Sequence, residues 1–156
     1  YWVVAHFHYV MMGGTVIAFF GGLHYWWPKI TGKMYKESWG QLGAVLVFIG
    51  FNVTFMSQFI MGGRGMPRRY FNYLDQFAPM HMYSTFGSWI LAVAFFITAV
   101  NLLASLKYGA KAPANPWGGT TMEWETDSPP ITHNFHHQPV LTHEPYDYRP
   151  REATHV

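Results

Sequence analysis

Three long stretches of this sequence contain no Asp, Glu, Lys or Arg, and they constrain its fold more than any other feature. The stretches cover about residues 2–27, 39–62 and 80–106. A helix needs roughly 20 apolar residues to cross the hydrocarbon core of a bilayer, and each stretch is long enough. The sequence therefore predicts an all-α membrane protein with three transmembrane helices. They lie in a membrane region over residues 1–111, and a tail follows over residues 112–156.

The tail and the edges of the stretches have a different composition. The tail is polar and rich in proline, so we expect it to be extended, with little regular structure and no core of its own. Trp26 and Trp27 precede Pro28, a pattern that is typical of a membrane interface and predicts that the first helix stops there. The chain begins at the edge of a predicted helix, so we expect it to be a fragment or split product of a longer protein.

Basic side chains predict the orientation in the membrane. The first loop and the segment after the third stretch carry Lys29, Lys33, Lys36, Lys107 and Lys111. The second loop carries Arg64, Arg68 and Arg69. Because loops on the inner side of a membrane have an excess of Lys and Arg, five against three places the first loop and the tail inside. The second loop then lies outside.

The residue types that are scarce or absent exclude several classes of function. The chain has no cysteine, which excludes disulfides, thiolate-ligated haem and iron–sulfur clusters within it. Only 12% of the residues are charged, and the formal net charge is +2. We expect the lipid bilayer, and no nucleic acid, as the surroundings of this chain.

The first stretch contains two histidines with one residue between them. His6 and His8 flank Phe7. On a helix, residues at i and i+2 project about 200° apart, so these two rings cannot bind one metal ion together. They can bind two different metals, and imidazole is a nitrogen ligand suited to haem iron. Since a helix with its side chains is about 10–12 Å across, the two irons would be about 13 Å apart.

The residues by themselves leave other interpretations open. A histidine inside the membrane often hydrogen-bonds to a neighbouring helix and has no further role. His6 is close to the predicted start of its span, so the two rings are also compatible with an interfacial pair. Asn52 and Gln58 are intramembrane amides that can hydrogen-bond across helices, although packing is the role that we expect. His24 and His81 stand near span ends, where an interfacial histidine needs no function. The tail histidines are irregularly spaced, which argues against a metal site: His133, His136, His137, His143 and His155.

Several motifs carry a resemblance to a known family. The run Val3–Val10 (VVAHFHYV) resembles helix ten of subunit I of the cytochrome c oxidases, in the haem-copper oxidase superfamily. The run Gly65–Tyr70 (GMPRRY) resembles that family's loop between helices eleven and twelve. Tail runs such as Asn115–Trp124 (NPWGGTTMEW) are similar to bacterial members. The resemblance covers nearly the whole chain and implies the last three of twelve helices plus the tail, in a bacterial inner membrane.

The resemblance also implies roles for particular residues. His6 corresponds to the ligand of the high-spin haem iron, His8 to an axial ligand of the low-spin haem iron, and Phe7 to the aromatic residue between the two haems. Arg68 and Arg69 correspond to the arginines that hold the haem propionates. Tyr1 corresponds to a tyrosine near a low-spin haem propionate. Both haems are expected to be haem A, and the copper of the assembled subunit has no ligand in this chain.

The resemblance implies an enzyme that works only as an assembled complex. It is a terminal oxidase that takes electrons from cytochrome c, reduces oxygen to water and pumps protons. The expected partners are the remainder of the catalytic subunit, other subunits that include the copper-bearing subunit II, and cytochrome c. We expect the tail to lie along the inner-side surfaces of these subunits. The alternatives are a quinol oxidase of the same superfamily and a non-catalytic haem-binding membrane subunit.

Overall fold

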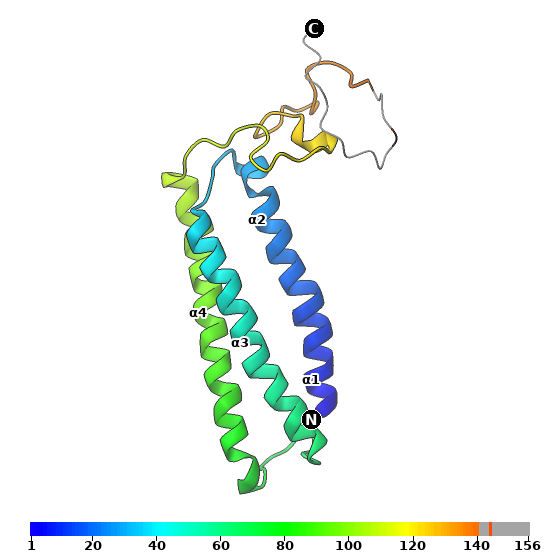
Figure 1. The fold of residues 1–156 in the computed structure, drawn as a ribbon, viewed down its shortest axis with the longest axis vertical. Helices are drawn as coiled ribbons and strands as arrows, with labels where there is room; N and C mark the ends of the chain where they lie inside the picture. Colours follow the sequence, from blue (N-terminus) through cyan, green and yellow to red (C-terminus); the bar gives the residue numbers. More distant parts are fainter. Residues whose placement is uncertain (141–143, 145–156) are drawn as a thin grey trace.

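Three long helical rods make up most of the molecule (Figure 1). The computed structural model describes residues 1–140 and residue 144. The elements are the α-helices α1 (Trp2–His8), α2 (Ile17–Thr31), α3 (Glu37–Gly63) and α4 (Ala78–Tyr108), the π-helix η1 (Tyr9–Val16), and the 3₁₀ turns η2 (Asp75–Phe77) and η3 (Met122–Trp124). The first rod is continuous through α1, η1 and α2. The part of the chain that the structure describes has no β-strand, which confirms the all-α prediction.

Each rod is long and apolar enough to cross a membrane. The three candidate spans are Trp2–Thr31, Glu37–Gly63 and Asp75–Tyr108. The first loop and the start of the tail lie together at one end, because Met34 N donates a hydrogen bond to Ala110 O over 2.9 Å. The loop between α3 and η2 lies at the other end, as three successive spans require (Figure 1). Which end faces the inner side stays a prediction from the basic residues.

The prediction that the first helix stops at Pro28 is wrong. The helix continues to Thr31 and ends at Gly32, which has a left-handed backbone with φ of 68°. Thr31 Oγ1 donates a hydrogen bond of 2.7 Å to Trp27 O, and Gly32 N donates one of 2.8 Å to Pro28 O. These bonds complete a last turn after the proline, and glycine is the residue that enters the left-handed region at little cost.

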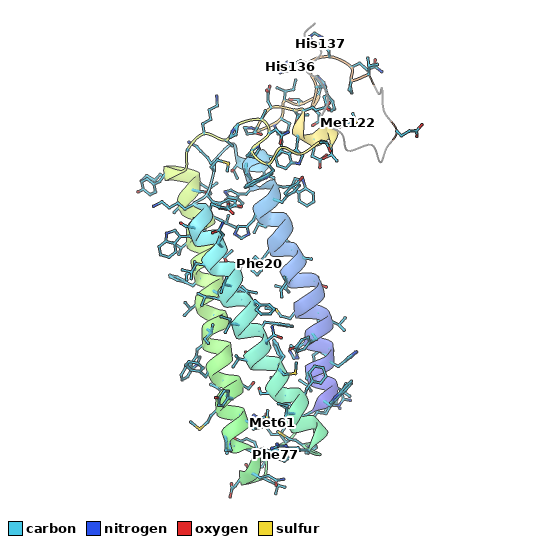
Figure 2. All side chains as sticks on the ribbon, viewed as in Figure 1. Phe20, Met61, Phe77, Met122, His136 and His137 are labelled. Atoms are coloured by element: carbon cyan, nitrogen blue, oxygen red, sulfur yellow. The ribbon has the colours of Figure 1, made fainter. Side chains whose placement is uncertain are left out.

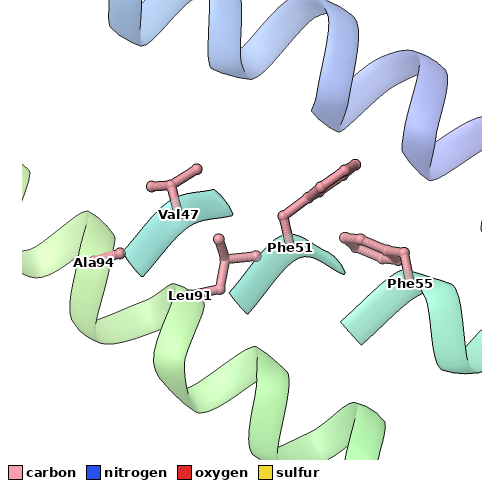
Figure 3. Close-up of a cluster of buried hydrophobic side chains, with 5 residues drawn as sticks. All are labelled: Val47, Phe51, Phe55, Leu91 and Ala94. Carbon is pink, nitrogen blue, oxygen red and sulfur yellow. The ribbon is translucent and has the colours of Figure 1, made fainter. Parts of the chain in front are cut away.

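Close approach of small residues joins α3 to α4. A Cβ atom added at Gly50 would lie 2.7 Å from the backbone nitrogen of Leu91, and one added at Gly87 would lie 2.6 Å from that of Thr54. Such small residues let helix backbones come together in a membrane. Beside this crossing, buried apolar side chains from both helices form one cluster (Figure 3): Val47, Phe51, Phe55, Leu91 and Ala94.

The first rod packs on α3 through its N-terminal half, α1 and η1. Tyr9 OH donates a hydrogen bond of 2.9 Å to Asn52 Oδ1, so Asn52 bonds across helices, a role that the sequence left second to packing. The π-helix over Tyr9–Val16 contains Gly13, where a Cβ atom would lie 3.0 Å from the ring of Phe51. The absent side chain at Gly13 therefore makes room for a core aromatic residue, a local adjustment that the sequence did not reveal.

The start of the tail is anchored to the end of α2. Trp124 is 2% exposed, and its Nε1 donates a hydrogen bond of 2.6 Å to Tyr25 OH. Lys29 is 7% exposed, and its ammonium group donates to the backbone carbonyls of Ala114 (2.9 Å), Thr126 (2.7 Å) and Asp127 (3.3 Å). The start of the tail is therefore buried against α2, which its composition did not indicate, because its tryptophan and these carbonyls surround a lysine of the helix.

Candidate functional site

The two histidines lie on the first two turns of the first rod. α1 is α-helical from Trp2 to His8, so the rings of His6 and His8 leave the helix about 200° apart, as their spacing predicts. Ala5 is fully buried on the side that faces α3, while His6 is exposed and His8 is half-buried. The helix backbone at Trp2 comes so close to Gly62 of α3 that no Cβ atom fits there.

The His8 ring has a fixed orientation. Its Nδ1 atom is 2.8 Å from Val4 O. A carbonyl oxygen only accepts hydrogen bonds, so Nδ1 carries the proton and Nε2 keeps its lone pair in the neutral ring. The ring also stacks on Phe55 of α3 with 4.6 Å between centroids and on Phe7 with 4.5 Å. This side chain is therefore prepared to donate a lone pair from Nε2.

The surroundings of His6 differ from those of His8. The His6 ring stacks on Trp2 with 5.5 Å between centroids and 10° between planes. The Phe7 ring, predicted between two cofactors, contacts His8 and is 37% exposed. α1 thus presents the His6 ring with Trp2 on one face and the His8 ring, stacked on Phe7 and Phe55, on another.

Arg68 and Arg69 lie in the segment between α3 and η2, residues 64–74, which we call the arginine loop. Both arginines are exposed. Within residues 1–140, the only ion pair joins His136 to Asp127, so neither guanidinium has a carboxylate partner there. Arg69 has a left-handed backbone with φ of 58°. A non-glycine residue rarely adopts this conformation, so the loop must be held in place by its neighbours.

Aromatic rings fix the arginine loop to the start of α1 and to α4. The backbone nitrogen of Tyr1 donates a hydrogen bond of 2.8 Å to Met66 O, and the Tyr1 ring is 5.7 Å from the Tyr70 ring. His81 of α4 is 4.2 Å from the Tyr73 ring and 5.6 Å from the Tyr70 ring, measured between centroids. Burial, together with a hydrogen bond to Tyr70, raises the pKa of the Tyr1 hydroxyl above its ordinary value.

A small buried cluster lies beneath this ring contact. Met66 is 2% exposed and packs with Met61 of α3 and Phe77 of η2. Met61 and Phe77 are at the end of the molecule opposite His136 and Met122 (Figure 2). The arginine loop is therefore attached to the end of the bundle at which α1, and with it the histidine pair, begins.

Sequence reasoning missed the contribution of His81 to this arrangement. We expected no role for a histidine near a span end, yet His81 contacts Tyr1, Tyr70 and Tyr73. No pattern in the sequence links these positions, because the contact depends on how α4 packs. Gln58 donates a hydrogen bond of 3.2 Å to Ser84 Oγ, so this amide also bonds across helices.

No group of three or more His, Asp or Glu side chains within residues 1–140 is arranged to hold a metal ion. The tail residues His143 and His155 lie outside the described residues. A metal at His6 or at His8 would therefore take one ligand from this helix and its other ligands from elsewhere.

Comparisons with known proteins identify relatives of this chain. The profile of the family described as cytochrome c and quinol oxidase polypeptide I matches residues 1–90. Cytochrome c oxidase subunit 1 of Synechocystis sp. is 46% identical over 148 residues, which are 95% of this chain and 27% of that protein. The protein of the same name from Thermostichus vulcanus is 44% identical over 99% of this chain and 28% of its own length. Heme-copper oxidase subunit I+III of Aeropyrum pernix is 45% identical over 90% of this chain and 17% of its own length.

Proposed function

The chain belongs to the family of cytochrome c and quinol oxidase polypeptide I, and on this premise we propose that it forms the last membrane helices of a terminal oxidase's catalytic subunit. It is an integral membrane protein that spans about a quarter of the length of its first relatives. The proposed reaction of the assembled enzyme is electron transfer from cytochrome c to oxygen, coupled to proton pumping. The observation that carries the proposal is the histidine pair on opposite faces of α1, beside an anchored arginine loop.

The residues on α1 fit the haem groups that the family implies. Each imidazole would be a suitable ligand for haem iron, and the bond from His8 Nδ1 to Val4 O leaves the Nε2 lone pair available. Haem iron, when bound, supplies one-electron transfer at one site and oxygen reduction at the other. We assign His6 to the high-spin iron and His8 to the low-spin iron. Phe7 supplies an aromatic ring next to His8, and haem A is the proposed form of both groups.

The arginine loop fits the carboxylate side of the same groups. A guanidinium binds a carboxylate through two parallel hydrogen bonds and keeps its charge at every relevant pH. Arg68 and Arg69 are exposed and have no acidic partner within the described residues, so both remain available for haem propionates. Tyr1 anchors the loop through its backbone bond to Met66. The proposed role of the aromatic contacts is to hold two adjacent cations beside the start of α1.

The proposed site is completed only by other parts of the enzyme. The second ligand of the low-spin iron and the ligands of copper come, in this proposal, from the remainder of the catalytic subunit. The proposed partners also include the copper-bearing subunit II and cytochrome c as electron donor. Relatives named cytochrome c oxidase support this donor, whereas the family description also covers quinol, which makes a quinol oxidase the second candidate.

Spectra of the assembled complex with single histidine substitutions test the proposal. We expect His6→Ala to remove the haem that reacts with carbon monoxide and His8→Ala to disrupt the other haem. His24→Ala is the matched control, because His24 lies on the same rod and its Nδ1 atom bonds to Phe20 O over 2.8 Å, as His8 does to Val4. The control is expected to keep both haem signals.

The outcomes separate the candidates. Loss of a different haem signal in each variant supports one ligand on each face of α1. Two unchanged haem signals in both variants would contradict the assignment, and loss of one shared signal would indicate a carrier with a single haem. Oxidation of reduced cytochrome c against oxidation of a quinol by the unmodified complex then distinguishes the two donors.

A further inference from the structure

An open groove lies between the first turns of α3 and the last turns of α4. Its volume is about 510 Å³. Its lining residues belong to the segment before α3, the first turn of α3 and the last turns of α4. These parts are at the end of the bundle that carries the tail, and α1 begins at the other end (Figure 1). Its main lining residues are Met34, Lys36, Trp39, Phe96, Val100 and Tyr108. Nothing in the proposed oxidase site uses this groove.

The body of the groove is apolar. Phe96 is 70% exposed and Trp39 is 48% exposed, so large apolar surfaces face outward. The polar side chains inside it already have partners within the chain. Asn101 bonds with the backbone of Lys36 over 3.0 and 3.1 Å, and Ser105 Oγ accepts a hydrogen bond of 2.7 Å from Trp27 Nε1. Apart from Lys36 at its mouth, the groove therefore offers an apolar wall whose polar side chains, Asn101 and Ser105, have partners within the described residues.

The length of the groove matches one leaflet of a bilayer. Phe96 and Tyr108 are twelve positions apart on α4, which corresponds to about 18 Å along the helix axis. The hydrocarbon core of a bilayer is about 30 Å thick, so one leaflet is about 15 Å. Trp39 and Tyr108 line the groove near the helix ends, where amphipathic aromatic rings favour the interface between lipid and water.

The mouth of the groove is cationic. Lys36 lines it, no acidic side chain does, and the Lys36 ammonium group has no hydrogen-bond partner within the described residues. Lys33 and Lys107 are at the same end of the bundle but do not line the groove: the Lys33 ammonium group lies 3.4 Å from Gly109 O, and that of Lys107 lies over the Tyr108 ring. An apolar body with a cationic mouth is complementary to an acyl chain with an anionic headgroup.

A transmembrane helix fits this groove less well than a lipid. Helix interfaces in membranes are rich in small residues, which let backbones approach closely. Gly43, Gly50 and Gly87 are already in the contact between α3 and α4. The groove has small residues only toward the end of α4, at Ala104, Ser105 and Gly109, while bulky side chains such as Trp39, Phe96 and Tyr108 stand at its edges and suit a flexible acyl chain.

We propose that this groove binds an anionic phospholipid, with one acyl chain along α4 and the phosphate at Lys36. The inference requires only that the chain spans a membrane and does not depend on the proposed oxidase activity. Binding at this position fills the space between the ends of α3 and α4.

Lipid binding to the assembled, delipidated complex in detergent tests this inference. Phosphatidylglycerol or phosphatidylcholine is added, and bound lipid is counted by native mass spectrometry. We expect a retained phosphatidylglycerol that phosphatidylcholine does not replace. Lys36→Gln is expected to weaken its binding about fivefold, since one lysine near an anionic lipid contributes a factor of that order. Ala104→Trp, which places a large ring in the groove, is expected to abolish it.

A matched control distinguishes lipid binding in the groove from attraction of the lipid by the other lysines at this end of the bundle. Lys107 is a lysine at the same end that does not line the groove, and Lys107→Gln is expected to leave the affinity unchanged. An equal loss in both lysine variants would overturn the proposal, because it would indicate surface charge alone. Absence of retained lipid in the unmodified complex, or a crosslink from position 104 to another transmembrane helix, would overturn it as well.

Discussion

The basic side chains at the two ends of the helical rods differ in whether they have hydrogen-bond partners within the chain. At the tail end, Lys29 is 7% exposed and its ammonium group donates to three carbonyl oxygens of the same chain. At the other end, Arg68 and Arg69 are exposed and have no carboxylate partner within the described residues. The first arrangement is complete without any other molecule, whereas the second leaves two guanidinium groups open to a partner from outside this chain, as the proposed function requires. The hydrogen bonds of Lys29 end within the chain, and the proposed ones of Arg68 and Arg69 end on a bound group.

The largest effect is expected from a substitution in the arginine loop. In the assembled complex, Arg68→Gln should leave a bound carboxylate unpaired in a medium of low dielectric, which costs about 3–5 kcal/mol. We expect a lower midpoint potential of one haem, measured by redox titration, and a loss of oxygen consumption. Arg68→Lys keeps the charge but loses the two parallel hydrogen bonds of a guanidinium. Its haem potential and oxygen consumption should lie between those of the unmodified complex and of Arg68→Gln. An unchanged potential in Arg68→Gln would show that this arginine does not face a cofactor.

At the tail end, Lys29→Met tests whether one lysine anchors the tail. The substitution leaves three carbonyl groups without their donor, which we expect to cost about 1–3 kcal/mol. Limited proteolysis of the complex should then cut within residues 112–128 more rapidly, while the haem spectrum stays unchanged. Lys33→Met is the matched control, because the Lys33 ammonium group has a single bond of 3.4 Å to Gly109 O. Equal cleavage rates in both variants would show that Lys29 does not anchor the tail.

A smaller effect is expected from one hydrogen bond at the same end. Trp124→Phe keeps an aromatic ring in the buried position but loses the bond from Nε1 to Tyr25 OH. A neutral hydrogen bond contributes about 1 kcal/mol, so the tail should become only slightly easier to cleave. Tyr25→Phe should have a similar effect, and the double variant should add little to either. Additive effects in the double variant would show that the two side chains act separately.

The smallest effect is expected from His81→Phe at the arginine loop. The Nε2 atom of His81 is buried and has no hydrogen-bond partner in the described part of the chain. Replacing such a ring by an apolar ring of similar shape is nearly neutral, so thermal stability and haem potentials should stay within measurement error. His81→Ala, which removes the contact with Tyr73 and Tyr70, should shift a haem potential through the loop. Equal results for both substitutions would show that the ring contact does not position the arginines.

Much of the fold followed from local pattern, and part of the site did not. The charge-free stretches predicted three helices because a bilayer demands about 20 apolar residues in a row. The spacing of His6 and His8 predicted opposite faces because helical geometry is regular, and α1 is α-helical over both residues. The π-helical turn over Tyr9–Val16 was not predictable, since its Gly13 accommodates a ring of α3 that no local pattern reveals.

The tail shows most clearly why local pattern fails. Its proline-rich composition predicted a segment without a core, and composition alone does describe such segments well. Trp124 is buried all the same, because Tyr25 and Lys29 of α2 offer it a hydrogen-bond partner and a cation. These partners are about a hundred positions apart in the sequence, so nothing near the tryptophan signals the contact.

The sequence by itself determined that the chain spans a membrane, that two imidazoles face opposite ways, and which family the chain resembles. These properties depend on residue type and on short spacings along one helix. The bilayer requires apolar helices, and the geometry of a helix is regular. Only the tertiary structure decided that the arginine loop is anchored by Tyr1 and His81, and that Lys29 is used up inside the chain. Those outcomes depend on which side chains meet when three rods pack together, and such long-range packing is not encoded in any local pattern.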